Sequence, residues 1–559
     1  MSVHEKITKL IRRTLLHTLK EWDAVATRDN SLKNILSHDE GRLRGLKLTN
    51  LQLEPSHFKP VENDFELHLT HDYSTVSTAR AFRKGQLIEL SLADTVDKEE
   101  WTKVNGIISE VKGQSIYLQA SKLGDNFLLH NLSKNSPTIV NLSQRSTKPI
   151  IETSAKALKN LKLNRFNYRV SKSIVDPDNQ IPDQYTKQDQ KSQPIFMQED
   201  FLDQDKIQAV NLCCECHPLT IIHGPPGTGK TTGLAAVILS ELANGSRILA
   251  VAPSHAAVDA LTMALLKQWN ENALKLPKSK LIRIGNPLRL RDENVLPYLP
   301  KLHDQSQCLL EELHEVWTSL INSDKGAKKM LIKEESELLR KSQKSRRSEM
   351  FSQIKHCSVV TSTCLTALAW KKEILRSFDI ICIDEAAFAP DWLTLPLVLS
   401  GVPRVILSGD HFQLPPVVTF QSSITSLMER CIHKVPTSTL NQQFRSNEII
   451  SNWSSKHFYQ GQLKAHANVK DTNLNDLVEK PIEMLGKSLV FVDTSDSNYF
   501  EDCKGEFEGS YSNLNEAYIV EDIVKEYVDR GINPEDIGII SPYWSQVALL
   551  RDLLIDLPL

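Results

Sequence analysis

Residues 221–232 read IIHGPPGTGKTT, an apolar run that enters a glycine-rich loop closed by a lysine and two threonines. The loop glycines let backbone N–H groups close around phosphate oxygens. Lys230 is spaced to reach the β and γ phosphates, and the Thr231 hydroxyl is placed for Mg²⁺. The helical pattern TTGLAAVILSELANG follows, so that a positive helix end faces the anion. The predicted nucleotide-binding residues of this loop are Gly224, Pro225, Pro226, Gly227, Thr228, Gly229, Lys230 and Thr231.

The sequence after this loop has the hydrophobic pattern of an α/β fold. Near-continuous apolar runs each end in polar residues, as strands do when helices cover both faces of a parallel sheet. In such sheets, ligands bind beyond the carboxyl ends of the strands, where these polar residues stand. The predicted strands are RILAVAP (247–253), FDIICIDEA (378–386), RVILSGD (404–410), LVFVDTSD (489–496) and IGIISPY (537–543).

Composition excludes several classes of protein. The chain has 559 residues, 40% of them hydrophobic and 24% charged, which is ordinary for a folded protein of several domains. No apolar run approaches the ~20 residues of a membrane helix, so we expect no membrane contact. The formal net charge of −3 means that any nucleic-acid binding must use a local groove.

Nine cysteines are scattered along the chain, which favours a reducing, intracellular compartment. They gather once, in CCECH (213–217). Two readings stay open for this cluster: thiols packed in a helix before the loop, which we favour, or ligands of a metal site that lacks an evident second pair.

Three domains are expected. Residues 1–190 would hold helices, a small barrel or meander built from the β-rich runs at 84–94 and 104–121, and a polar linker. The basic stretch 1–25 reads better as a structural helix than as a transit peptide. Residues 191–430 would form a first ATPase domain with a helical insertion at about 290–355, and residues 431–559 the start of a second. The basic end of the insertion is either a solvated helix face or an arm that contacts phosphates.

Two acidic residues follow a buried strand in IICIDEAA. Asp384 suits a Mg²⁺ ligand, and Glu385 suits the group that orients or deprotonates an attacking water. In VILSGDHFQLPP, Gln413 can reach the γ-phosphate with its side-chain amide, and prolines stiffen the turn that carries it. A group that reports the γ-phosphate couples hydrolysis to movement.

LNQQFRSN (440–447) supplies an arginine and an aromatic ring. Arg445, offered from a second domain, would stabilise transition-state charge. Phe444 beside it would stack on adenine. Kinases and small GTPases have no use for GDxxQLPP, and neither does a chaperone-like ring ATPase.

These motifs in this order resemble the superfamily 1 helicases, and within them the branch of the up-frameshift helicase and the immunoglobulin mu-binding protein. Further landmarks are APSHAAVD (252–259), VVTSTC (359–364), SLMER (426–430), HFYQGQL (457–463), NLNEA (513–517), IISPYWSQ (539–546) and the early GLKLTNLQL (45–53). The resemblance implies two RecA-like P-loop sheets, the second incomplete, with a helical stalk, a small β-barrel and a helical insertion. It also implies that Gln204, Phe444 and Glu516 join the nucleotide site, and that the strand is contacted by Pro253, Ser254, His255, Thr361, Thr363 and Pro542.

The activity implied by the resemblance is ATP- and Mg²⁺-dependent 5′→3′ movement along single-stranded DNA, with RNA as a further track, and duplex unwinding. The implied partners are the strand and, from one group of relatives, the replication machinery with DNA polymerase α. We expect a monomer in the nucleus, the cytoplasm or both. Neither the physiological strand nor the partner that directs the chain can be read from the sequence.

The chain departs from the family pattern at several positions. Lys206 stands where the family has a glutamine that reads adenine, with Gln204 and Gln208 two residues away on either side, which weakens the expected adenine selectivity. Phe388 replaces a glutamine after the acidic motif, and His255 replaces an asparagine.

The sequence ends at Leu559, before any match to the last helicase motifs, which carry a second catalytic arginine. We therefore expect nucleotide binding with poor hydrolysis, as in a fragment, a truncated gene product or a degenerate copy. The alternative function is an ATP-binding nucleic-acid clamp that does not unwind.

Overall fold

The structure is a computed structural model that describes residues 2–35, 47–53, 59–61, 64–70, 82–92, 103–112, 115–120, 138–144, 147–161, 166–176, 202–271, 280–301, 303–322, 325–420, 426–476, 487–495, 497–502 and 510–554. The chain divides into two compact units. The first comprises Met1–Asn30, Ser146–His303 and Ser345–Asp471, and the second Ser31–Arg145, Asp304–Lys344 and Thr472–Leu559. The predicted linker at 171–194 lies largely outside the described residues.

A seven-stranded parallel sheet forms the centre of the first unit, in the order β10-β11-β9-β12-β13-β8-β14. Its strands are β8 (Leu219–His223), β9 (Ile248–Ala252), β10 (Leu281–Ile284), β11 (Val359–Thr363), β12 (Ile380–Ile383), β13 (Arg404–Gly409) and β14 (Thr437–Thr439). Three of the five predicted runs, those ending near 253, 386 and 410, are confirmed as strands of this sheet. The parallel α/β fold class is confirmed with them.

Helices cover both faces of the sheet because successive strand residues point to opposite sides. Ile222 and Ile248 pack with helices α7 (Gln204–Cys214), α8 (Lys230–Ala243) and α9 (His255–Glu271). Ile221 and Leu249 pack on the other face. The helices of that second core are α1 (Val3–Ile35), α5 (Lys148–Lys159), α6 (Tyr168–Val175), α12 (Cys364–Leu368), α13 (Lys372–Leu375), α14 (Asp391–Val398) and α15 (Leu427–Cys431).

The remaining elements of the first unit are short. They are the 3₁₀ helices η6 (Pro287–Arg289) and η7 (Glu293–Tyr298), the paired strands β15 (Gln442–Gln443) and β16 (Lys464–Ala465), and the helices α16 (Glu448–Phe458) and α17 (Ala467–Lys470). Residues 431–471 thus group with the first unit, although the sequence placed them in a second domain. The three-domain division itself stays a prediction.

The second unit contains a closed antiparallel barrel. Its ring runs β1 (Lys47–Leu53), β7 (Thr138–Gln144), β4 (Leu87–Leu92), β5 (Lys103–Lys112), β6 (Ser115–Ala120) and β3 (Asp64–Thr70), and β3 pairs with β1 again. β2 (Lys59–Val61) extends β3. Alternate residues such as Ile116, Leu118 and Ala120 of β6 face the barrel core. The expected small barrel is confirmed.

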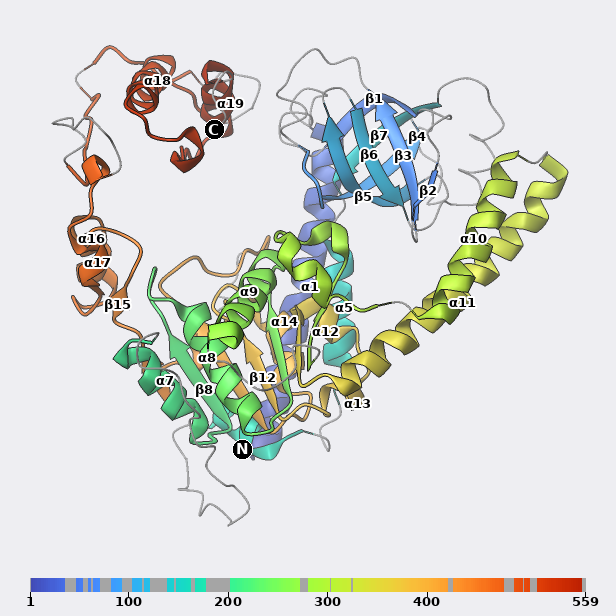
Figure 1. Cartoon of the computed structure of the whole chain (residues 1–559), viewed down its shortest axis with the longest axis horizontal. Helices are drawn as coiled ribbons and strands as arrows, with labels where there is room; N and C mark the ends of the chain where they lie inside the picture. The colour runs from blue at the N-terminus through green and yellow to red at the C-terminus, as the bar shows by residue number, and fades with distance from the viewer. Residues whose placement is uncertain are drawn as a thin grey trace. The chain divides into compact units, whose positions relative to one another are not determined.

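The helical insertion is confirmed as well. It consists of α10 (Asp304–Asn322) and α11 (Lys325–His356), which Figure 1 shows as a long helical pair. Trp317 on α10 is buried in the same core as the barrel residues and donates its Nε1–H to Glu335 of α11 at 3.2 Å. Within the second unit, the tip of the insertion therefore packs on the barrel.

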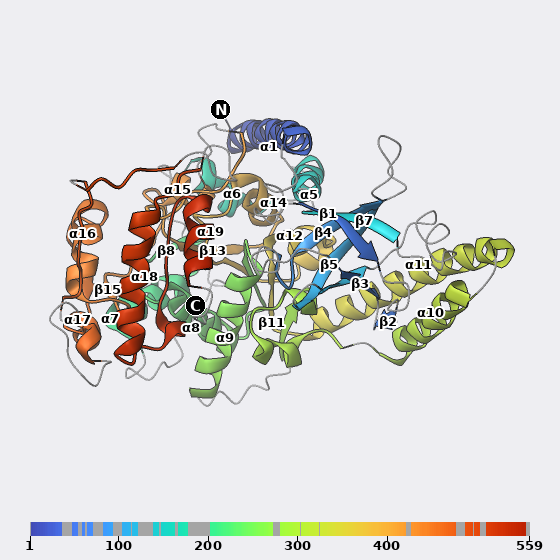
Figure 2. The same ribbon diagram turned by 90° about the horizontal axis from the view of Figure 1, so that it is seen from above.

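The predicted strands at 489–496 and 537–543 are wrong. Figure 2 shows helices α18 (Leu514–Asp529) and α19 (Trp544–Leu553) in the last part of the chain, and the described residues of the two runs form no strand. Phe491 is 87% exposed and Ile540 96% exposed. An apolar run becomes a strand only when a neighbour takes its backbone hydrogen bonds, which the composition of the run does not reveal. The 3₁₀ helices η8 (Leu474–Asp476) and η9 (Pro534–Asp536) complete the described elements. None of the helices described has both the length and the apolar character needed to cross a bilayer.

Candidate nucleotide and strand-contact site

The loop between β8 and α8 has the conformation of a phosphate cradle. Gly227 and Gly229 have φ of 77° and 76°, in the left-handed region that favours glycine. Thr228 donates its hydroxyl to the Pro225 carbonyl at 2.8 Å, which closes the turn. Lys230 is the first residue of α8, so it stands among the free N–H groups of the helix start.

The loop leaves no room for side chains on its glycines. A Cβ on Gly224 would lie 2.1 Å from Cγ of Lys230, and one on Gly227 would lie 2.7 Å from Cβ of Arg445. The residues of this loop fit a nucleoside triphosphate. The side chains of Lys230 and Arg445 occupy the space that a Cβ on Gly224 or Gly227 would need, so both positions require glycine.

Thr231 and Asp384 meet at the predicted Mg²⁺ position. The Thr231 hydroxyl donates to Oδ2 of Asp384 at 3.0 Å, although the two residues are 153 positions apart. Asp384 is buried at the end of β12, and burial, then the neighbouring Glu385, raise its pKa to about 6. A hydroxyl and a carboxylate in contact are oxygen ligands of the kind that Mg²⁺ prefers.

Glu385 has a strained backbone. Its φ is 51°, one of three positive values among non-glycine residues of the described chain. Strain of this kind persists only where the surroundings enforce it, and it is concentrated at functional sites. The half-buried Glu385 side chain lines a cavity together with Gln413.

Asp410 organises the segment that carries Gln413. Its Oδ2 accepts from Nε2 of Gln413 and from the Tyr459 hydroxyl, both at 2.8 Å, and its Oδ1 accepts from Nε2 of His223 and from the Phe412 backbone. Burial alone would raise the pKa of Asp410, but these hydrogen bonds outweigh it and hold the pKa at about 2. The carboxylate thus links β8, the Gln413 turn and α16.

His411 joins His223 and Asp410 in a group whose ligand atoms lie within 4.8 Å of one another. Both Asp410 oxygens already accept two hydrogen bonds each. We therefore interpret the group as a hydrogen-bond scaffold behind the phosphate loop.

One cavity of about 530 Å³ joins the predicted catalytic and strand-contacting residues. Glu385 and Gln413 line it together with Pro253 and Ser254, and Phe388 and Phe412 add aromatic walls. All of these residues belong to the first unit. Residues predicted for hydrolysis and residues predicted for strand contact therefore line the same cavity.

The segment with Phe444 and Arg445 lies directly on the phosphate loop. The Phe444 N–H donates to the Gly227 carbonyl at 2.9 Å, and the preceding strand β14 pairs with β8. Arg445 groups with the compact unit that contains the phosphate loop, and its predicted origin in a second domain stays a prediction. Its exposed side chain stays beside the loop.

Lys206 is the α7 side chain that reaches the phosphate loop. It is 5% exposed, forms an ion pair with Asp203, and its ammonium lies 4.5 Å from the centre of the Phe444 ring. Its Cε would lie 2.9 Å from a Cβ on Gly229. Gln204, predicted in the nucleotide site, is exposed on the helix instead, so Lys206 occupies the position next to the loop.

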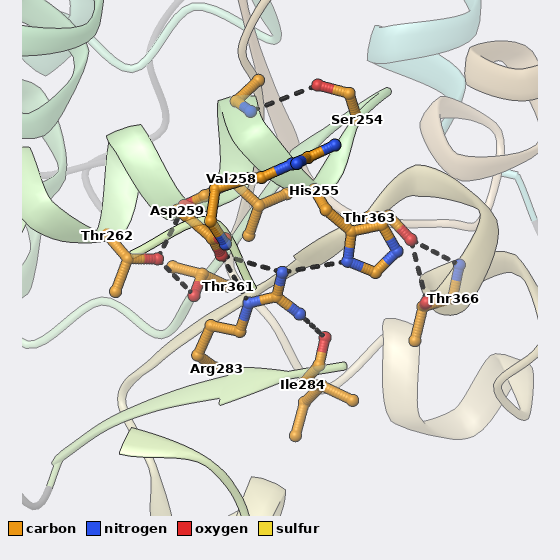
Figure 3. A network of polar contacts seen from close by, with 12 residues as sticks. Ser254, His255, Val258, Asp259, Thr262, Arg283, Ile284, Thr361, Thr363 and Thr366 are labelled. Atoms are coloured by element: carbon orange, nitrogen blue, oxygen red, sulfur yellow. Dashed lines mark hydrogen bonds and ion pairs between the residues drawn. The ribbon is translucent and has the colours of Figure 1, made fainter. Parts of the chain in front are cut away.

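His255 belongs to a polar network at the start of α9 (Figure 3). Arg283 on β10 is fully buried and donates to Oδ1 of Asp259 from Nε and Nη2, at 3.0 and 2.9 Å. Its Nη2 also donates to Nδ1 of His255 at 3.1 Å. Burial, then the charges of Arg289, Arg283 and Arg291, lower the pKa of His255 to about 3, so the ring is neutral.

The predicted strand-contacting threonines are buried in internal hydrogen bonds. The Thr361 hydroxyl lies 2.9 Å from that of Thr262, and Thr363 caps α12 by accepting from the Thr366 N–H at 3.2 Å (Figure 3). Ser254 is exposed, and its hydroxyl accepts from the Ala257 N–H at 3.2 Å. The strand-contact role of both threonines stays a prediction.

Glu516 and Pro542 lie in the second unit. Oε1 of Glu516 accepts from the Thr494 hydroxyl at 2.8 Å, and Pro542 is exposed. Their predicted roles in nucleotide and strand binding stay predictions.

Sequence reasoning missed the residues that support the site. These are His223, Asp259, Arg283, Arg289, Arg291, Asp410 and Tyr459. The available signal was LIRIGNPLRLRDE (281–293), where several arginines follow a strand in a chain of net negative charge. A partner that is distant in sequence, such as Asp410 for His223, leaves no such local signal.

Comparison with known proteins places these features in a family. Two family models, each described as an AAA domain, match residues 201–421 and 423–557. DNA-binding protein SMUBP-2 of Mesocricetus auratus is 28% identical over 510 residues, which cover 86% of this chain and 48% of the relative. DNA polymerase alpha-associated DNA helicase A of Schizosaccharomyces pombe is 30% identical over 365 residues, 62% of this chain and 53% of the relative. Regulator of nonsense transcripts 1 of Caenorhabditis elegans is 27% identical over 484 residues, 83% of this chain and 41% of the relative.

A solved arterivirus nonstructural protein 10 (helicase) covers 68% of this chain and 57% of its own, with 12% identity and a TM-score of 0.29. The chain spans about half the length of the curated relatives it matches. Through its two matched domains and these relatives, the chain belongs to the superfamily 1 helicases, in the branch of the up-frameshift and immunoglobulin mu-binding proteins.

Proposed function

We propose that this chain is an ATP-dependent motor that moves 5′→3′ along single-stranded DNA or RNA and separates duplexes. The observation that carries the proposal is a single cavity whose lining includes Glu385 and Gln413 as well as Pro253 and Ser254. A group that senses the γ-phosphate and a group that holds a strand must move together in a motor, and a shared wall couples them directly.

Each residue of the site has a role in this proposal. Lys230 and the loop N–H groups hold the β and γ phosphates, and Thr231 and Asp384 hold Mg²⁺. An ion held there would supply positive charge beside the phosphate oxygens. Glu385, held in its strained turn, orients the attacking water, and Arg445 offsets charge as the γ-phosphate leaves.

Gln413 is the proposed switch. Its amide nitrogen donates to Asp410, which leaves the amide oxygen for water or phosphate. A shift of Gln413 pulls on a carboxylate that also holds Tyr459 of α16 and His223 before the phosphate loop. ATP hydrolysis would thereby be coupled to a movement at the end of α16 through two hydrogen bonds, Gln413–Asp410 and Asp410–Tyr459.

The test is ATP hydrolysis with and without single-stranded DNA or RNA. We expect weak turnover that a strand stimulates in the chain, none in Lys230→Ala, and turnover that no longer responds to the strand in Gln413→Ala. Gln208→Ala, a change of an exposed α7 residue, is the matched control. If the chain binds nucleotide and strand but shows no turnover under any condition, the proposed motor is excluded and the ATP-binding nucleic-acid clamp is favoured instead.

Two further proposals concern partners and place. The relatives named for association with DNA polymerase alpha motivate a pull-down of that polymerase with this chain, which we propose acts as a monomer in the nucleus or the cytoplasm. Failure of the chain to co-purify with the polymerase would exclude that partner.

A further inference from the structure

Two arginines next to the His255 network have no acidic partner. Arg289 ends the 3₁₀ helix η6 and is half-buried, and Arg291 is exposed two residues later. Within the described chain, no carboxylate lies within ion-pair distance of either guanidinium. A half-buried charge without a partner is costly unless a ligand supplies the opposite charge.

The carboxylate of the His255 network, Asp259, already has its hydrogen-bond partners. Oδ1 of Asp259 accepts two hydrogen bonds from the Arg283 guanidinium, and Oδ2 accepts from the Arg291 backbone N–H at 2.8 Å. Asp259 and Arg283 are both buried, so they neutralise each other. What remains is the positive charge of Arg289 and Arg291, and burial followed by the charges of Arg291 and Arg283 lowers the pKa of Arg289.

The Asp259–Arg283 pair also fixes the loop that carries these arginines. Through the Arg291 N–H it ties the loop to α9, and Asn286 caps η6 by accepting from the Leu288 N–H at 2.8 Å. The arginines therefore stand on a backbone that is held in place before a ligand arrives, which lowers the entropic cost of binding.

His255 contributes a third donor of defined position. A guanidinium can only donate hydrogen bonds, so Nδ1 of His255 must accept the bond from Arg283. The ring is neutral, and its proton is on Nε2. The ring thus offers one N–H donor in this network, and His255 directly follows Pro253 and Ser254, which line the cavity.

We propose that Arg289, Arg291 and the Nε2–H of His255 form a subsite for the phosphodiester backbone of a single nucleic-acid strand, with Arg283 and Asp259 as its buried support. The inference rests on the strand binding of the proposed function and names the anionic group that this face takes. Two guanidinium groups and a neutral N–H donor match the charge and the acceptor oxygens of a phosphodiester, and they carry no information about base identity.

The experiment measures affinity for fluorescent single-stranded DNA and RNA over a series of salt concentrations. The variants are Arg289→Ala, Arg291→Ala and the double variant, with Arg12→Ala, an exposed arginine of α1, as the charge-matched control. For a single strand, each phosphate contact contributes about 0.7 to the slope of log affinity against log salt. We expect the double variant to lose about 0.7 of that slope if both arginines hold one phosphate, or about 1.4 if each holds its own.

Two additions separate charge from fold. His255→Asn keeps an N–H donor and should retain affinity, whereas His255→Phe should lose several-fold, and a strand with uncharged methylphosphonate linkages should bind the wild type and the double variant equally. An unchanged slope in the double variant overturns the subsite while leaving the proposed function intact. A wild-type chain that binds nucleotide through Lys230 but no strand overturns both.

Discussion

At the scale of single residues, the site depends on charges whose partners lie far apart in the sequence. His255 is neutral because burial, and then the charges of three nearby arginines, lower its pKa, and one of these arginines donates to its Nδ1. Asp410 is ionised because donors from three segments converge on it. The phosphate loop could be predicted from residues adjacent in the sequence. These pairings could not, since Arg283 lies 24 residues from Asp259 and His223 lies 187 residues from Asp410.

The pKa of His255 predicts an acid dependence of stability. Because the folded pKa is about 3 against an ordinary 6.5, the unfolded chain binds the proton first and stability falls as the pH drops from 6.5 towards 3. Each pH unit in this window costs up to about 1.4 kcal/mol. His411, with its pKa lowered to about 4 by burial, adds to the same loss.

We expect His255→Asn to weaken the pH dependence of the free energy of unfolding of the first unit between pH 6 and pH 4, measured by urea denaturation. The groups that face His255 are Arg283, Arg289 and Arg291, and all of them stay charged in this window. His457→Asn, which removes an exposed imidazole, is the control. Parallel curves for His255→Asn and the wild type would show that the ring is not buried neutral.

Lys206 predicts an unusual nucleotide preference. An ammonium only donates, so it suits the two acceptors O6 and N7 of guanine, whereas a glutamine amide suits the donor–acceptor edge of adenine. The Lys206 ammonium lies against Phe444, beside the phosphate loop. We expect the chain to bind ATP and GTP with similar affinity, and Lys206→Gln to shift the ratio towards ATP by roughly tenfold.

The measurement is a competition titration with both nucleotides. Lys206→Gln leaves Asp203 without its ion pair, so Asp203→Asn is combined with it to keep the buried site neutral. Gln208→Ala should leave the ratio unchanged. A wild-type chain that already prefers ATP by tenfold or more would rule out a role of Lys206 in base selection.

At the scale of elements, local pattern was enough wherever a strand is covered on both faces. The segments before 253, 386 and 410 became β9, β12 and β13 because helices bury them from both sides. The runs at 489–496 and 537–543 have the same composition but no pairing partner in the described chain. The barrel was only half foreseen, because its closure by β1 and β7 joins residues about 90 positions apart, such as Leu48 and Leu142.

Helix α8 and the turn after it give a pair of opposite glycine predictions. Gly233 is inside the helix, and a Cβ there would meet its nearest atom at 3.7 Å, an ordinary contact. Gly245 follows the helix with φ of 87° and open space around it. We expect Gly233→Ala to stabilise the first unit by about 1 kcal/mol and Gly245→Ala to destabilise it by about 1 kcal/mol.

Thermal unfolding followed by circular dichroism tests both substitutions under the same conditions. Because Gly233 packs near Lys206, nucleotide affinity is measured alongside and should be unchanged. Loss of stability in Gly233→Ala would mean that the space between α8 and Leu440 is tighter than 3.9 Å indicates.

At the scale of the whole molecule, the chain order of the two units is interleaved. The second unit takes residues from three separate stretches, and α11 runs from one unit into the other. Contacts inside each unit, rather than the order of the sequence, therefore decide which parts unfold together. Within the second unit, Trp317 is one of the insertion side chains buried in the barrel core.

Trp317→Ala should consequently destabilise one unit and spare the other. Truncating a fully buried tryptophan costs about 3–5 kcal/mol, and Glu335 would also lose the Nε1–H donor at 3.2 Å. In calorimetry we expect the transition of the barrel and insertion to move to lower temperature. The transition of the first unit, recognised because ATP and Mg²⁺ raise it, should stay in place. Met330→Ala, at a position 79% exposed on α11, serves as the control that keeps both transitions. If Trp317→Ala instead lowered the nucleotide-sensitive transition to the same extent, α11 would transmit the loss and the two units would unfold as one.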